Sequence, residues 1–141
     1  MKTQSGRSMI EMLGVLAIIG VLSIGGLAGY TRAMNSYQAN QLMDYMNRCS
    51  VVVQENLAVG AGAPANCAAA LPGETAPVAG TITYARVPAE GAQTGFTLTT
   101  TAGEPDADVR TTIANKTPDG AVVGGVNWAI NGTSIRATYT L

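Results

Sequence analysis

The 141-residue sequence contains no histidine and only two cysteines. Without histidine, the chain lacks the usual general base near neutral pH, the serine-triad chemistry of hydrolases and the commonest nitrogen ligand of zinc sites. Charged residues make up only 12% of the chain, and eight basic against nine acidic side chains give a formal charge of −1. This balance gives no electrostatic footprint for wrapping nucleic acid. We therefore expect neither an enzyme nor a nucleic-acid-binding protein, and no cofactor or metal.

Charges are missing altogether from one long run near the N-terminus. The 20 residues from Met12 to Thr31 read MLGVLAIIGVLSIGGLAGYT and contain none. As a helix with a rise of about 1.5 Å per residue, this run matches the roughly 30 Å hydrocarbon thickness of a bilayer. Lys2 and Arg7 precede it and Arg32 follows it, so the positive-inside rule places the N-terminus in the cytoplasm and the bulk of the chain outside.

Two other interpretations of this run are a cleaved secretory signal and a plain single-pass anchor. Small residues such as Gly26 and Ala28 stand at the spacing that signal peptidase prefers. Against a cleaved signal, Glu11 places a carboxylate at the start of the apolar run. The helical pattern also continues beyond the run, which a cleaved signal does not predict.

That continuation is a single apolar stripe at spacings of three and four residues, formed by Met34, Tyr37, Leu42, Tyr45, Met46, Cys49, Val52, Val53 and Leu57. Polar residues occupy the opposite face, and Gly60 to Gly62 supply a stop before Pro64. We expect one continuous helix of about 50 residues, apolar all round over 7–31 and amphipathic over 32–60.

The remainder of the chain is rich in Gly, Pro, Ala and Thr and contains short alternating runs typical of strands. These runs are Thr81–Val87, Gly95–Thr101, Gly125–Ile130 and Thr133–Leu141, with a fifth short strand at 121–123. We expect an α+β fold in which residues 61–80 link the helix to an antiparallel sheet over 81–141. The side chains expected to face the helix are Ile82, Tyr84, Phe96, Leu98, Trp128, Ile130, Ile135 and Tyr139.

Three turns punctuate this sheet. Asn131-Gly132 predicts a hairpin with a type I′ turn, which needs positive φ at both central residues. The segments 104–106 and 118–120 each combine Pro with Asp and predict turns as well.

A short basic leader ends at Gly6, Glu11 follows five residues later, and the apolar run begins directly after it. This N-terminus, SGRSMIEML followed by GVLAIIGVLSIGGLAGY, resembles that of the type IV pilins and the related pseudopilins. The match covers about residues 5–37, a quarter of the chain. The resemblance implies a structural subunit that forms a helical filament with copies of itself, rather than an enzyme.

The resemblance also implies a processing pathway. In that family a membrane-embedded prepilin peptidase cuts after the Gly and methylates the new amine, which here separates the leader 1–6 from Arg7. Arg7 departs from the family pattern, because the first mature residue is usually apolar and most often Phe. The implied route runs from the bacterial inner membrane, through an inner-membrane assembly platform, to a surface filament or a periplasmic pseudopilus.

Glu11 becomes the fifth mature residue after this cleavage. A carboxylate within a membrane helix costs roughly 2.5–3.5 kcal/mol, and less near the interface. The resemblance implies that its charge pairs with the N-terminal amine of a neighbouring subunit and so selects the axial register of assembly. The alternative is a glutamate that snorkels just outside the hydrocarbon and needs no partner.

Glycines in the apolar run favour close helix packing. Gly25 and Gly29 form a G-x-x-x-G pair. We expect Gly14 and Gly20 to lie on other faces, so that several faces can pack. Adjacent glycines at 25 and 26 also weaken the helix where many pilins carry a Pro, although Gly is frequent in membrane helices for other reasons.

Cys49 and Cys67 make one possible disulfide, since an even cysteine count outside the cytoplasm favours oxidation. Many pilins place their disulfide near the C-terminus instead, and the alternative here is two buried thiols. Acidic residues at 104, 106 and 108 favour a solvated loop over a calcium site.

The sequence also allows functions other than that of a pilin. A pseudopilin or minor pilin of a type II secretion or DNA-uptake machine shares these features, and a filament-tip adhesin is the alternative of another class. The four basic and six acidic residues of 64–141 give no support for binding DNA. A membrane-tethered hydrolase is disfavoured, because no nucleophile paired with a base is found.

Overall fold

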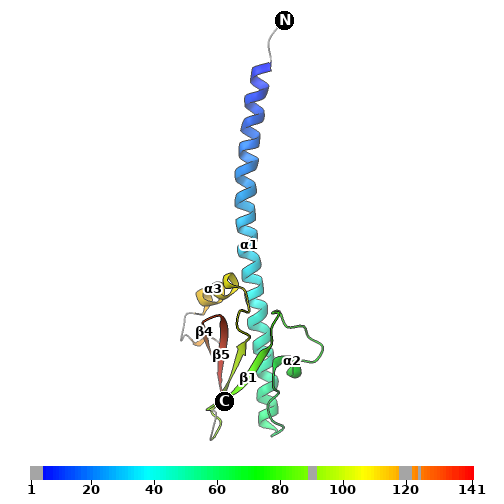
Figure 1. The fold of residues 1–141 in the computed structure, drawn as a ribbon, viewed down its shortest axis with the longest axis vertical. Helices are drawn as coiled ribbons and strands as arrows, with labels where there is room; N and C mark the ends of the chain where they lie inside the picture. The colour runs from blue at the N-terminus through cyan, green and yellow to red at the C-terminus, as the bar shows by residue number, and fades with distance from the viewer. Residues whose placement is uncertain (1–4, 89–91, 118–121, 124) are drawn as a thin grey trace. The chain divides into compact units, whose positions relative to one another are not determined.

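A computed structural model describes residues 5–88, 92–117, 122–123 and 125–141. Within this described part the chain forms a long N-terminal helix followed by an antiparallel sheet, which confirms the expected α+β fold (Figure 1). Residues 1–34 and 35–141 are two compact units, and α1 contributes to both. The elements in chain order are α1 (Ser5–Ala58), α2 (Cys67–Ala70), β1 (Ile82–Val87), β2 (Gly95–Thr100), α3 (Ala107–Lys116), β3 (Val122–Val123), β4 (Val126–Asn131) and β5 (Ser134–Thr140).

The sheet has the strand order β1-β2-β5-β4-β3, and every neighbouring pair is antiparallel. β5, the last strand, therefore inserts between β2 and β4 and pairs with both. All four longer strands coincide with the predicted runs to within about one residue, and β3 confirms the short strand. The predicted turn at 118–120 lies outside the described residues.

The β4–β5 hairpin is confirmed, but its turn differs from the type I′ turn predicted. Asn131 still pairs with Ser134 at the end of the ladder, so the two central residues are Gly132 and Thr133. Only Gly132 has a positive φ, of 63°. Positive φ at the first central residue alone is the pattern of a type II′ turn, which glycine adopts without steric cost.

The core of the second unit lies between one face of α1 and one face of the sheet. The helix contributes Ala39, Leu42, Met46, Cys49 and Val53 at alternating spacings of three and four, together with Tyr45. Sheet residues that face it include Ile82, Phe96, Leu98, Trp128, Ile135 and Tyr139, all predicted from the alternation.

Part of the predicted apolar stripe was wrong. Tyr37 is 57% exposed and Met34 37% exposed, so the buried stripe begins at Ala39, a residue that the prediction omitted. Predicted core residues Tyr84 and Ile130 are only half-buried. The buried stripe begins at the turn where Lys116 of α3 contacts Ser36 and Asn40.

Helix α3 was not predicted, because residues 81–141 were expected to form only sheet. Val109 and Ile113, four residues apart, are its buried residues. Lys116, at its C-terminal end, donates from Nζ to Ser36 Oγ at 2.9 Å and to Asn40 Oδ1 at 2.7 Å, which ties α3 to α1. The predicted turn at 104–106 instead leads into this helix, with Asp106 as its N-cap residue.

The segment 61–80, expected as a plain linker, contains the one-turn helix α2. Asn66 caps α2 through its side chain, since Oδ1 accepts from the Ala69 backbone amide at 2.8 Å. Cys67, the first residue of α2, is bonded to Cys49 of α1, so the predicted disulfide is confirmed. Arg48 also holds this segment through an ion pair of 2.7 Å to Glu74.

Loss of the disulfide should destabilise the second unit. The bond closes a loop with a sequence separation of 18, which corresponds to about 3 kcal/mol of unfolding free energy in the loop-entropy description. We expect Cys49→Ala/Cys67→Ala to lower the free energy of unfolding by this amount, measured by denaturant titration in micelles with the buried Trp128 as fluorescence reporter. A reductant should destabilise only the unsubstituted chain, and equal effects on both would contradict this assignment.

Stability should also fall at alkaline pH. Burial raises the pKa of Tyr139 well above its ordinary value, and a side-chain hydrogen bond with Ser50 offsets part of this effect. Because the unfolded chain releases the phenolic proton at about pH 10 while the folded chain retains it, the stabilising contribution is complete below pH 10 and is lost as pH rises further. Tyr139→Phe should therefore reduce the slope of stability against pH above pH 10. Identical slopes in the two proteins would refute this origin.

Candidate functional site: the apolar helix and its carboxylate

The apolar part of α1 exposes its side chains on every side. The large apolar residues from Met9 to Leu27 are each between 53% and 74% exposed. Soluble monomers rarely expose a continuous apolar surface of this extent. Among the described helices, α1 alone is long and apolar enough to cross a membrane, and none of its most apolar window is buried within the chain. This surface is compatible with a helix that crosses a bilayer once.

Glu11 places the one acidic group on this part of the helix. It lies in the α-helical region of α1, directly before the uncharged run, and no other Asp or Glu occurs until Asp44. The residue is exposed on the helix surface. Its carboxylate therefore faces whatever covers the apolar helix, where a cationic partner would offset the cost of removing it from water.

The predicted processing site, Gly6 and Arg7, falls in the first turn of α1. The side chains of these two residues lie outside the described part of the structure, as do leader residues 1–4. α1 then continues without a break through Gly25 and Gly26 to Ala58. One helix thus carries both the apolar run and the amphipathic half, as the sequence predicted.

The glycines leave open space on the helix surface. A Cβ atom added at Gly14, Gly20, Gly25 or Gly29 would meet nothing within 4 Å. The expectation that Gly14 lies on a different face from the G-x-x-x-G pair is wrong. At 3.6 residues per turn, Gly14 stands about 20° around the axis from Gly25, whereas Gly20 stands about 140° away. Gly14, Gly25 and Gly29 therefore lie on one side of the helix, here called the glycine face, together with the larger Ile18 and Val21.

The acidic residues after β2 lie at the N-terminal end of α3. Asp106 is the N-cap residue of α3 and Asp108 lies in its first turn, where negative charge stabilises the helix N-terminus. Within the described residues, no group of three or more His, Cys, Asp or Glu side chains is arranged to hold a metal ion.

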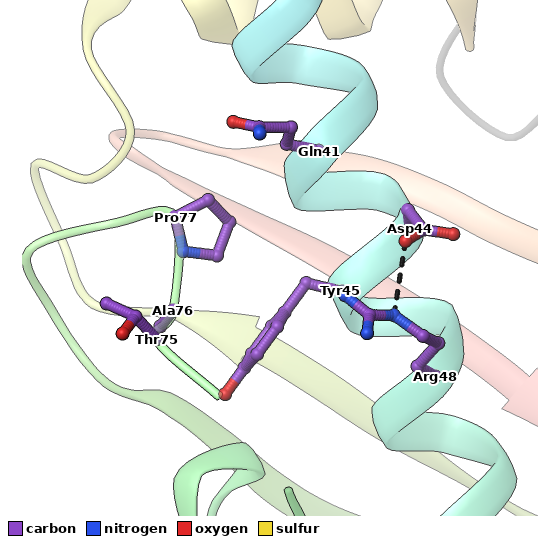
Figure 2. A pocket seen from close by; sticks show the side chains of 7 residues that line it. All are labelled: Gln41, Asp44, Tyr45, Arg48, Thr75, Ala76 and Pro77. Carbon is purple, nitrogen blue, oxygen red and sulfur yellow. Dashed lines mark ion pairs between the residues drawn. The ribbon is translucent and has the colours of Figure 1, made fainter. Parts of the chain in front are cut away.

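A pocket in the second unit was not predicted from the sequence. It lies beside α1 and is lined by Gln41, Asp44, Tyr45, Arg48, Thr75, Ala76 and Pro77, as Figure 2 shows. Burial raises the pKa of Tyr45, with Glu74 adding to the shift and Arg48 opposing it. No sequence signal could have found this pocket, because residues from α1 meet a loop about 30 positions later only in the folded chain.

A single charge placed within the apolar run should prevent membrane retention. Arg at the centre of a membrane helix costs roughly 2.5–3.5 kcal/mol, which is about a hundredfold in the insertion equilibrium. We expect Val21→Arg to shift the chain from the carbonate-resistant membrane fraction to the soluble or degraded fraction. Gln38→Arg, an exposed position of the later helix, is the matched control. Equal membrane retention of both variants would contradict a membrane-spanning helix.

Comparison with known protein families, with curated proteins and with solved structures finds no match to this chain. Its function is therefore argued from its own residues. They combine an exposed apolar helix, one carboxylate at the start of that helix, and a disulfide-braced sheet domain at its other end.

Proposed function

We propose that this chain is a structural subunit of a type IV pilus or a pilus-like filament. In this proposal, prepilin peptidase cuts between Gly6 and Arg7, and the apolar half of α1 leaves the bilayer to pack against the same segment of other copies. The observation that carries the proposal is the position of Glu11, the single carboxylate directly before a fully exposed apolar helix.

A filament core would cover the apolar side chains of this helix and also place a cationic group near the Glu11 carboxylate. A single membrane anchor does only the first of these. A bilayer covers apolar side chains but provides no counterion for a carboxylate. The N-terminal amine that cleavage creates on a neighbouring subunit would supply one. Breaking a buried ion pair by removing one partner costs about 3–5 kcal/mol, so only the axial stagger that aligns amine and carboxylate would be stable.

The glycine face supports helix-to-helix packing. Helices in an apolar environment associate through close van der Waals contact, and small residues allow their backbones to approach. Gly14, Gly25 and Gly29 provide such a face, and Gly20 provides a second point of approach on another side of the helix. A subunit surrounded by copies of itself needs more than one such surface.

The same features support a pseudopilin or minor pilin of a type II secretion or DNA-uptake machine. Both alternatives use the same cleavage, the same membrane precursor and the same assembly platform. They differ in where the processed chain accumulates: an abundant pilin is found in sheared surface material, and a pseudopilin stays in the cell envelope.

The deciding experiment measures the N-terminal mass of the chain in sheared surface and membrane fractions. We expect the wild-type chain to begin at Arg7 and to be found in the surface fraction, and Glu11→Ala to be processed but retained in the membrane. Glu55→Ala, which removes an exposed carboxylate from the later part of α1, should assemble normally. A wild-type chain found only in the membrane with residues 1–6 intact would overturn the proposal.

A further inference from the structure

The five tyrosines of this chain divide by exposure. Three of them are buried or half-buried in the sheet domain. Tyr30 and Tyr37 are 63% and 57% exposed. These two stand on either side of Thr31, the last residue of the uncharged run. The chain therefore exposes tyrosine only where that run ends.

Tyrosine suits this position in a chain that crosses a membrane. It combines an apolar ring with a polar hydroxyl and is enriched where a bilayer meets water. Tyr37 lies six residues beyond Thr31, which is about 9 Å along a helix. The headgroup region adds roughly 5–7 Å to each side of the hydrocarbon core. Helical side chains lean toward the N-terminus of their helix, so the Tyr37 ring extends back toward the uncharged run and within range of the headgroups.

The fold itself makes little use of Tyr37. The buried stripe of α1 begins two residues later, at Ala39, so the ring lies outside the core. Its hydroxyl accepts from Gln41 Nε2 at 2.9 Å, which leaves the hydroxyl hydrogen able to donate. A single exposed apolar side chain such as Val51 is ordinary on a protein surface. Tyr37 differs from Val51 because it stands near the end of the uncharged run and carries a polar group.

Lys116 places a cation at the same turn of α1. Its Nζ donates to Ser36 Oγ at 2.9 Å and to Asn40 Oδ1 at 2.7 Å, and these two residues flank Tyr37 in sequence. Both partners are neutral, so neither offsets the charge, and an ammonium group has a third N–H to donate. The nearest carboxylate along α1 is already paired with Arg48 at 3.1 Å. An exposed aromatic ring and a cation are the residue types that anchor proteins at a membrane interface.

We propose that Tyr37 and Lys116 contact the phospholipid headgroups of the bilayer that α1 crosses. The Tyr37 ring lies among the glycerol and ester groups, and Lys116 donates its third N–H to a lipid phosphate. These two contacts hold the end of the 35–141 unit at which α1 enters against the membrane surface. This inference rests on the membrane-spanning precursor of the proposed function, and not on filament assembly.

The test measures the depth of a tryptophan in the full chain, reconstituted at a low protein-to-lipid ratio in vesicles of phosphatidylcholine and phosphatidylglycerol. Tyr37→Trp is the test variant, Leu22→Trp marks the centre of the uncharged run, and Val51→Trp marks an exposed position of the later helix. Parallel vesicles carry a nitroxide quencher either on the lipid headgroup or near the end of an acyl chain. The unsubstituted chain, whose one tryptophan, Trp128, is buried, gives the background fluorescence.

We expect each position to report a different depth. The headgroup nitroxide should quench Tyr37→Trp at least about twofold more than the chain-end nitroxide does, because the two labels lie at different depths in the bilayer. Leu22→Trp should show the reverse order, and Val51→Trp should be quenched by neither label.

A second pair of variants tests the cation. Lys116→Gln can still donate to Ser36 and Asn40 but lacks the charge, so in the Tyr37→Trp chain it should reduce quenching by the headgroup nitroxide. Arg136→Gln removes an exposed cation from β5 and should leave the quenching unchanged. Equal quenching in these two variants would overturn the contact assigned to Lys116.

The outcomes for Tyr37→Trp separate this inference from the proposed function. Quenching no stronger than that of Val51→Trp would overturn the headgroup contact, as would stronger quenching by the chain-end label than by the headgroup label. Both of these outcomes leave the proposed function standing. A Leu22→Trp chain that the chain-end label does not quench would overturn the membrane-spanning helix itself, and with it both proposals.

Discussion

The apolar side chains between Met9 and Leu27 impose the constraint on which the rest of this molecule depends. Each contributes about 1.5–3 kcal/mol when it is fully removed from water, yet within a single chain each of the large ones stays more than half exposed. None of the most apolar window of α1 is buried within the described part of the chain. Lipid would cover them if the helix spans a membrane, and other copies of the chain would cover them in the proposed filament. In the proposed filament, Glu11 would set the axial register of neighbouring subunits, and the glycine face would allow their helices to pack closely.

The second unit also has an apolar surface to bury, namely one face of its small sheet. A sheet of this size buries only a modest core alone, so the later turns of α1 supply its other side through residues such as Leu42 and Met46. The Cys49–Cys67 bond and the Lys116 contacts then tie the linker and α3 to the same helix. The same helix therefore has two roles: its first part exposes apolar side chains, and its later turns form part of the core of the sheet domain.

The elements of this fold that could be predicted are those whose apolar residues follow a local periodic pattern. An uncharged run and a period-two alternation depend only on neighbouring residues, so α1 and the four longer strands were predicted closely. Helix α3 was missed because Thr111, Thr112 and Ile113 favour strands by propensity. In the folded chain, the threonine hydroxyls donate to carbonyls four residues earlier, and Val109 and Ile113 are buried together. Tertiary burial thus outweighs propensity there. The buried stripe likewise begins beside Lys116 of α3, a contact that no local pattern predicts.

Glu11 and Tyr45 each place a polar group beside apolar residues, and they differ in how they can be found. Glu11 stands directly before an uncharged run of 20 residues, so the sequence alone draws attention to it. Tyr45 fits its apolar stripe perfectly well, and only the folded structure shows that its hydroxyl is buried without a partner among the described residues. At Tyr45 the unpaired hydroxyl is a cost that the folded chain carries, whereas at Glu11 the proposed filament would place the carboxylate against a neighbouring subunit.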